Sequence, residues 1–228
     1  MNNRKTILLT VVAVACVGLI YFFSRGADEK KRYSWKESYL ASSAQPYGTS
    51  FLVKMMEDYR PEGEFIFNTK EPVRNVLRSL KEPEATDYIL VGPSIHLDRE
   101  SIQELAKFLD AGGNAFIASL SPPKELLGTV YINECEEDIE YDGHLATSIT
   151  ANFFHPDLAD KGNKTVAYRI VDSDTIRVWP FLDRKNICDA VSVLSPLGYE
   201  DPDRINFFRI KVGKGNLFLH TDPILFTN

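Results

Sequence analysis

The chain has 228 residues, of which 44% are hydrophobic and 25% are charged, and its formal net charge is −6. This composition is typical of a folded globular protein and excludes a disordered, collagen-like or low-complexity chain. Residues 1–32 carry six basic and two acidic side chains, a net charge of +4, whereas the remaining residues carry 20 basic and 30 acidic side chains, a net charge of −10. This acidic balance argues against a nucleic-acid-binding surface, which needs clustered Lys and Arg.

Residues 7–23 form an apolar segment without a charged side chain. As a helix it would be about 25 Å long, at the short end of the length that spans a bilayer. Arg4 and Lys5 also fit the start of a cleavable signal peptide, but the bulky Tyr21-Phe22-Phe23 stands where a small-residue cleavage site is expected. We therefore predict an uncleaved membrane anchor, with Cys16 as a helix residue and not a lipid attachment site.

The sequence predicts two parts, an anchor with a charged spacer over residues 1–32 and one globular domain over residues 33–228. Basic residues flank both ends of the apolar segment, so the positive-inside rule does not give the orientation in the membrane. The two cysteines outside the anchor, Cys135 and Cys188, leave two readings open. They could pair in an oxidising compartment, or they could be two buried thiols.

The first half of the domain alternates between expected strands and helices. Thr49 and Asp98 can cap helices, Ser121 with Pro122 can start a third, and Gly112-Gly113 is a helix stop. Strands are expected at residues 33–39, 65–67, 88–91 and 115–118, and helices at residues 49–56, 73–80, 98–109 and 121–127. Such alternation predicts right-handed crossovers and a mostly parallel sheet covered by helices.

The second half reads as strands, which we expect to add β structure to the sheet or to form a lobe on it. These strands are predicted at residues 145–149, 165–171, 190–194, 206–212 and 217–221, with a turn at residues 213–216 between the last two. Residues 222–228 are apolar in part, and no closing element is expected there.

Several short motifs together resemble a known family. They are residues 35–39, Pro46-Tyr47-Gly48-Thr49, the strand that leads to Gly92, the stretch 108–118 around Gly112-Gly113, and residues 220–228. The chain resembles an uncharacterised membrane-anchored family of Bacteroidetes, the domain of unknown function DUF4350. The resemblance implies a fold like that of the class I glutamine amidotransferases, a flavodoxin-like three-layer sandwich.

The resemblance also implies a location and partners. It implies a single-pass protein of the inner membrane with a periplasmic domain, encoded beside MoxR-type ATPases. Members of the family usually continue to a second membrane helix, so the chain is interpreted as truncated or divergent at Asn228.

Candidate binding residues lie in three loops that would leave the carboxyl ends of parallel strands, where α/β sheets bind ligands. The first loop, residues 41–48, brings Tyr47, Gly48 and Thr49 to a helix N-terminus, which favours an anion. The same residues are also explained by a turn and a helix cap. The other two loops, residues 92–97 and 119–121, contain the candidates Ser94, His96, Ser119 and Ser121.

Ser119 falls near the place where the resembled amidotransferases carry their catalytic cysteine, and that cysteine is absent here. A serine would need a base within about 3 Å and an oxyanion hole, and the glycines of a nucleophile elbow are missing. His96 is the best-placed histidine, whereas His155-Pro156-Asp157 is interpreted as a loop turn. We therefore expect no catalytic residue.

An acidic segment, residues 134–142, imitates the opening of a calcium loop. The twelfth position of that loop should be a bidentate Glu but is Ile149, so a solvated acidic loop is the preferred interpretation and weak calcium binding the alternative. We expect neither a metal nor a cofactor.

Two functions follow from this sequence. The first is an anchored envelope protein whose catalytically degenerate domain binds an envelope protein partner or a small ligand. The second is a hydrolase of small amides or esters that uses Ser119 or Ser121 with His96 or His155.

Overall fold

The computed structural model describes residues 33–67, 71–130, 141–154, 166–169, 176–187 and 194–228. Contacts divide the chain into the units Met1–Trp35 and Lys36–Asn228, and the elements below belong to the second unit. The predicted anchor at residues 7–23 and the cysteines Cys16, Cys135 and Cys188 lie outside the described residues. Among the residues that are described, no helix is both long enough and apolar enough to cross a membrane.

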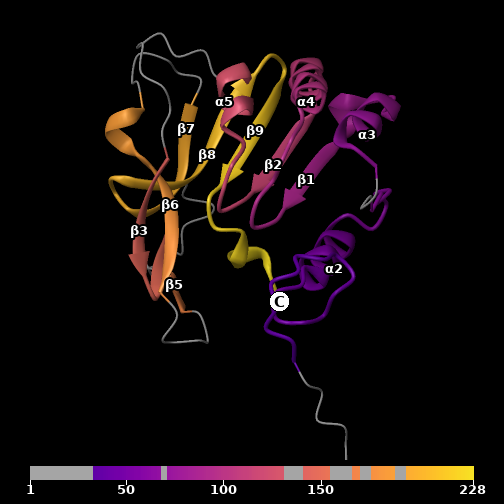
Figure 1. Cartoon of the computed structure of the whole chain (residues 1–228). Coiled ribbons are helices and arrows are strands. Elements are labelled where there is room, and N and C mark those ends of the chain that lie inside the picture. Colours follow the sequence, from indigo (N-terminus) through magenta and orange to yellow (C-terminus); the bar gives the residue numbers. More distant parts are fainter. Residues whose placement is uncertain (1–32, 68–70, 131–140, 155–165, 170–175, 188–193) are drawn as a thin grey trace, which may run out of the picture. The chain divides into compact units, whose positions relative to one another are not determined.

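The four α-helices that the structure describes all precede β3 in the chain (Figure 1). The longest, α4, begins as its sequence predicts, because Asp98 Oδ1 accepts a hydrogen bond of 2.7 Å from the Ser101 N–H. It ends at Gly112, whose φ of 121° only glycine adopts readily. The α-helices are α2 (Ser50–Tyr59), α3 (Val73–Ser79), α4 (Arg99–Ala111) and α5 (Lys124–Val130), and the 3₁₀-helices are η1 (Pro83–Ala85), η2 (Arg184–Asn186) and η3 (Pro223–Phe226).

Nine strands form one mixed sheet with the order β1-β2-β9-β8-β7-β4-β5, and the pair β3 and β6 joins it through β8. Among the strands that the structure describes, the contacts of β1 with β2 and of β2 with β9 are parallel, and the others are antiparallel. The strands are β1 (Asp87–Val91), β2 (Asn114–Ala118), β3 (Tyr141–Ala146), β4 (Ser148–Phe153), β5 (Val166–Arg169), β6 (Arg177–Asp183), β7 (Leu194–Asp201), β8 (Arg204–Val212) and β9 (Gly215–His220).

The predicted flavodoxin-like, mostly parallel three-layer sandwich is therefore wrong. Residues 33–39 and 65–67, expected as strands, are irregular, so the parallel part has three strands. The turn at Gly213-Lys214 joins β8 directly to β9, and such a short connection makes neighbouring strands antiparallel. The strand expected at residues 145–149 is interrupted at Thr147, so that β3 pairs with β6 while β4 pairs with β7.

The main core lies on one face of the parallel strands. Leu105 and Leu109 of α4 pack there with side chains that alternate along β2 and β9. Burial of such side chains stabilises a fold by about 1.5–3 kcal/mol each. The fully buried strand residues of this face are Ala115, Ile117, Leu217 and Leu219. The helices α3, α4 and α5 all contribute to this core, so it holds them against the same face of the sheet.

A second, smaller core joins the loop before α2 to the strands of the second half. It contains Tyr39, Tyr47, Ile149, Trp179 and Ile224. The indole N–H of Trp179 donates a hydrogen bond of 3.0 Å to the Ala146 carbonyl. This core fixes the segment around residues 39–47 although that segment is not a strand.

Asn228 ties the last described residues to the start of α2. Its Oδ1 accepts a 2.8 Å hydrogen bond from the Phe51 N–H, and its Nδ2 donates to the carbonyls of Ser43 and Gln45 at 2.7 and 2.8 Å. Residues 223–226 form η3, although no element was expected there.

Gly48 and Gly128 provide a matched pair of substitutions. A Cβ at position 48 would lie 1.9 Å from the Ser43 carbonyl oxygen, whereas a Cβ at position 128 would meet nothing within 4 Å. We expect Gly48→Ala to lower the free energy of unfolding by about 1–3 kcal/mol, because backbone must move. Gly128→Ala, inside α5, should raise it by about 0.5–1 kcal/mol. Urea unfolding measures both values, and equal effects at the two positions would contradict the packing of the loop before α2.

Candidate functional site

The carboxyl ends of β1, β2 and β9 lie in register, at Val91, Ala118 and His220. The Ser119 N–H donates a hydrogen bond of 2.9 Å to the His220 carbonyl, and the Gly92 N–H donates to the Ala118 carbonyl at 3.0 Å. The loops that follow these three strands therefore meet at one edge of the sheet.

The structure brings the second and third predicted loops together through Ser119. This buried side chain donates its hydroxyl proton toward the Pro93 carbonyl at 3.4 Å and accepts a hydrogen bond of 3.1 Å from the Ser121 N–H. Ser94, His96 and Ser121 are exposed on the same loops. The Ser119 hydroxyl thus connects two loops and is not presented at the surface.

The end of the first predicted loop is buried, from Tyr47 to the helix start at Thr49. The Thr49 hydroxyl donates toward the Tyr39 carbonyl at 3.4 Å and makes no capping hydrogen bond to α2, where Asn228 Oδ1 binds the Phe51 N–H. Tyr39 itself has a φ of 49°, the left-handed region that non-glycine residues rarely occupy. Tyr47 and Gly48 are buried beside it. These contacts hold the loop against the start of α2. The Phe51 N–H, which an anion at the helix N-terminus would need, is already hydrogen-bonded to Asn228.

His220 is buried between aromatic side chains. Its Nδ1 accepts a hydrogen bond of 3.0 Å from the Asp222 N–H, and its ring lies 5.3 Å from the ring of Phe207 and 5.1 Å from that of Phe226. Burial lowers the pKa of His220 to about 3, so the imidazole is neutral at physiological pH. Among the described residues, no histidine is hydrogen-bonded to Ser119 or Ser121. His155 lies outside the described residues.

Residues 134–140 of the acidic segment, for which weak calcium binding is the alternative interpretation, are outside the described residues. Asp142, which is described, is exposed, and its Oδ1 accepts a hydrogen bond from the adjacent Gly143 N–H. In the described part of the chain, no three His, Cys, Asp or Glu side chains are placed to hold a metal ion.

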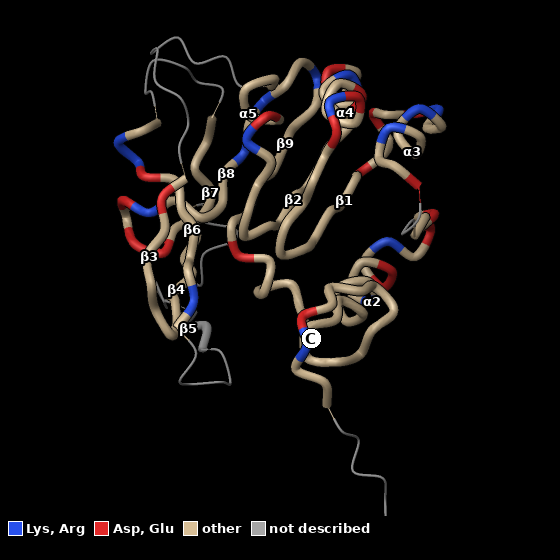
Figure 2. The backbone as a smooth tube through the Cα atoms, in the orientation of Figure 1, with Lys and Arg blue, Asp and Glu red and all other residues tan. Residues whose placement is uncertain are grey.

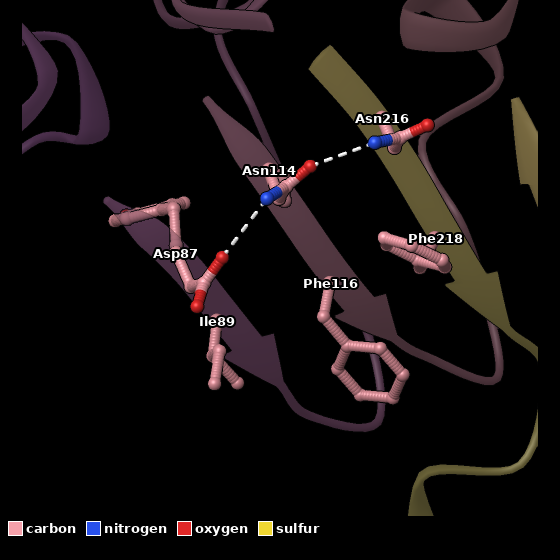
Figure 3. Close-up of a pocket in the computed structure, with 8 residues that line it drawn as sticks. Asp87, Ile89, Asn114, Phe116, Asn216 and Phe218 are labelled. Carbon is pink, nitrogen blue, oxygen red and sulfur yellow. Dashed lines mark hydrogen bonds between the residues drawn. The ribbon is translucent and has the colours of Figure 1, made fainter. Parts of the chain in front are cut away.

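A depression of about 330 Å³ lies on the sheet face opposite α4, away from the loops that the sequence predicts as candidate sites. Figure 3 shows its polar row, in which Asn216 Nδ2 donates to Asn114 Oδ1 at 2.9 Å and Asn114 Nδ2 donates to Asp87 Oδ1 at 3.1 Å. The Asp87 carboxylate also pairs with Arg60 at 3.3 Å. The row crosses all three parallel strands and keeps them in register.

An apolar row lies beside the polar one. Ile89, Phe116 and Phe218 are matched across β1, β2 and β9, two residues after the polar row (Figure 3). Ile89 is 40% exposed, and the two phenylalanines are partly exposed. We call these six residues the open face. It offers amide and carboxylate groups next to an apolar floor.

A signal for the open face is present in the sequence. The pairs Asp87-x-Ile89, Asn114-x-Phe116 and Asn216-x-Phe218 repeat one pattern, a polar residue followed two positions later by an apolar one. Because side chains alternate along a strand, each pair lies on a single face. Only the pairing of β9 with β2, however, shows that the three pairs align.

The open face carries fewer charged residues than the helical side of the domain. The strands β2 and β9 contain no Lys, Arg, Asp or Glu, whereas charged residues gather on α3 and α4 (Figure 2). Exposed side chains on α4 include Gln103 and Lys107. The helical side of the molecule is thus well solvated, and the open face has the lower charge density.

Comparison with known families identifies the family of this chain. Residues 41–228 match a domain of unknown function. The chain belongs to the DUF4350 family. This result confirms the family that the sequence motifs indicate, and it assigns no activity.

Comparison with solved structures shows the fold alone. The N-terminal domain of mmIFT52 superposes with a TM-score of 0.52 at 13% identity, over 85% of each chain. The exo-β-1,4-mannosidase Op5Man5 of Opitutaceae bacterium strain TAV5 gives a TM-score of 0.45 at 16% identity, and the match covers 84% of this chain and 30% of the mannosidase. The cytoplasmic protein STM3548 of Salmonella typhimurium gives 0.40 at 10% identity, over 74% of each chain. No curated protein matches the sequence.

Proposed function

We propose that this DUF4350 protein is an interaction module of the bacterial cell envelope, tethered to the inner membrane by residues 7–23, whose domain binds an envelope protein through the open face. The open face carries this proposal. It combines aromatic side chains, which dominate the energy of protein interfaces, with a polar row that can fix the register of a partner. The apolar segment and the basic residues around it support the tether.

A protein fits the open face better than a small molecule does. Ligand pockets are concave and bury most of their ligand, and their volumes are about 300–1,000 Å³. The depression here is at the lower end of that range, and it is lined by three adjacent strands of a sheet. A partner segment lying across the strands could cover Ile89 and the two phenylalanines together. Components of a MoxR-type ATPase system, in a periplasm of the Bacteroidetes type, are the partners that the family resemblance suggests.

The first prediction uses a photoreactive amino acid at position 89, on the open face, or at position 103, on the exposed side of α4. In native membranes we expect position 89 to crosslink a specific protein, which mass spectrometry identifies, because Ile89 would lie within the interface. Position 103 should give no such product, and equal crosslinking at both positions would contradict the proposal.

A charge substitution provides a second test. Ile89→Lys places a charge in an apolar contact and should weaken binding of the partner protein by about 10- to 100-fold, while Gln103→Lys should leave that binding unchanged.

The second prediction separates binding from serine hydrolysis. The hydrolase interpretation requires a reactive Ser119 or Ser121, whereas the Ser119 hydroxyl is buried and bonds to backbone groups. We expect a fluorophosphonate probe not to label the protein, because neither serine has a histidine partner among the described residues. Labelling that disappears in Ser119→Ala or Ser121→Ala would support hydrolysis and count against the binding module.

A further inference from the structure

Irregularities in the pairing of β7 with β8 leave two polar residues outside the regular ladder. The register shifts between Pro196 and Gly198, between Gly198 and Tyr199, and between Tyr199 and Asp201. The last two shifts leave Asn206 on β8 and Glu200 on β7 without a partner in the pairing. Such bulges change the direction of a side chain and are common next to functional sites. Both of these polar residues are buried.

The Glu200 carboxyl group has no hydrogen-bond partner among the described residues. Its side chain is 4% exposed, and both Oε1 and Oε2 are unsatisfied. A carboxylate buried in this way is costly, so it takes up a proton instead. Burial, followed by the negative charge of Asp222, raises the pKa of Glu200 to about 8, and the nearby Arg204 opposes the shift only in part.

Asp222 is the second buried carboxyl group. It lies two residues after the end of β9 and is fully buried. Its Oδ2 accepts a hydrogen bond of 3.1 Å from Asn206 Nδ2, whereas Oδ1 has no partner among the described residues. Burial raises the pKa of Asp222 to about 7, although the hydrogen bond from Asn206 lowers it. Two neighbouring acids that repel each other when ionised titrate as a pair.

Other charged and titratable groups approach the pair from three strands. From β3, His144 Nδ1 lies 3.3 Å from Glu200 Oε2, and burial lowers the pKa of His144, so the contact is between two neutral groups near pH 7. From β8 comes Arg204, whose guanidinium lies 5.3 Å from the centre of the Phe181 ring. From β7 comes Asp201, which forms an ion pair with Arg204 at 3.3 Å.

The contact of His144 with Glu200 supports a junction that has few backbone pairs. The antiparallel pair of β3 and β6 meets the rest of the sheet where Leu182 and Asp183 of β6 pair with Ile205 and Arg204 of β8. Trp179 is central in β6 and is 0% exposed. Any change that separates β3 and β6 from β8 would therefore alter the surroundings of Trp179.

We propose that Glu200 and Asp222 form a proton-binding site that holds β3 and β6 against the sheet, so that the loss of its protons loosens this part of the domain. With protons bound, the buried pair is neutral and packs against His144 without repulsion. With protons lost, two negative charges lie in a space that offers one hydrogen bond, from Asn206. Moving β3 and β6 outward would admit water to both carboxylates.

The direction of the pH dependence follows from proton counts. Between the ordinary carboxyl pKa of about 4 and the raised values of the pair, the folded protein binds more protons than the unfolded chain does. Stability from these groups is therefore complete at the acid end of that window and is lost as the pH rises through it. Most surface carboxylates show the opposite behaviour.

The experiment uses full-length protein with Trp35→Phe, which leaves Trp179 as the only tryptophan. As the pH rises from about 5 to about 9, we expect the emission of Trp179 to shift to longer wavelength and the melting temperature to fall. Glu200→Gln, which cannot ionise, should reduce both changes by at least about half, because one of the two acids is removed. Glu125→Gln, on the exposed side of α5, should behave like the parent protein.

An unchanged pH dependence in Glu200→Gln would overturn the proposal. If that variant does not fold, infrared difference spectra of the parent protein between about pH 6 and about pH 9 provide the test. The proposal predicts a carbonyl band of a protonated carboxylic acid that is present at the lower pH and lost at the higher one. The absence of this band at the lower pH would show that both acids are already ionised and would equally overturn the proposal.

Discussion

The pairing of β9 on both of its sides is the constraint on which the rest of the structure depends. On one side β9 is parallel to β2, and on the other it is antiparallel to β8, to which a tight turn at Gly213-Lys214 connects it. Gly213 has a φ of 53°, which suits that turn. The strand closest to the end of the described chain therefore lies in the middle of the sheet, between the helix-covered strands of the first half and the antiparallel strands of the second.

The open face and the buried carboxyl pair both follow from this position of β9. On one side of the strand, Asn216 and Phe218 complete rows that begin on β1 and β2, and these rows form the open face. Just beyond its carboxyl end, Asp222 turns into the interior and meets Asn206. The open face offers binding groups to a partner, and the carboxyl pair offers a response to pH. Because the open face lies on β1, β2 and β9, whereas Glu200 lies on β7 and Asp222 after β9, each feature can be altered without the other.

The sequence predicts β1, β2 and α4 well, because their signals are local, whereas the helix expected to start at Ser121 begins only at Lys124. The Asp98 cap, the Gly112 stop and the apolar spacing of α4 appear in the structure where they are expected. The order of the strands could not be predicted, because it depends on contacts between residues far apart in the chain. Residues 33–39 have the alternation of a strand, yet the structure describes them as irregular, and Tyr39 packs in the second core.

The candidate site was predicted only in part, for a related reason. Loops at the carboxyl ends of β1 and β2 do meet, as their positions indicate, but Ser119 links them to each other and is buried. Asn114, Asn216 and Phe218 become a surface only through the pairing of β9 with β2. Nothing in the sequence distinguishes Glu200 from an exposed acidic residue. Its burial depends on bulges in the pairing of β7 with β8, which no local motif predicts.

The central claim, that the open face is an occupied binding surface in the cell, is tested most directly by cysteine footprinting. Ile89→Cys would be labelled by a maleimide in native membranes and in the purified full-length protein, with Gln103→Cys as the reference. The account predicts that position 89 is labelled at least about 10-fold more slowly in membranes than after purification, while position 103 reacts equally in both. Equal labelling of position 89 in the two preparations would contradict it.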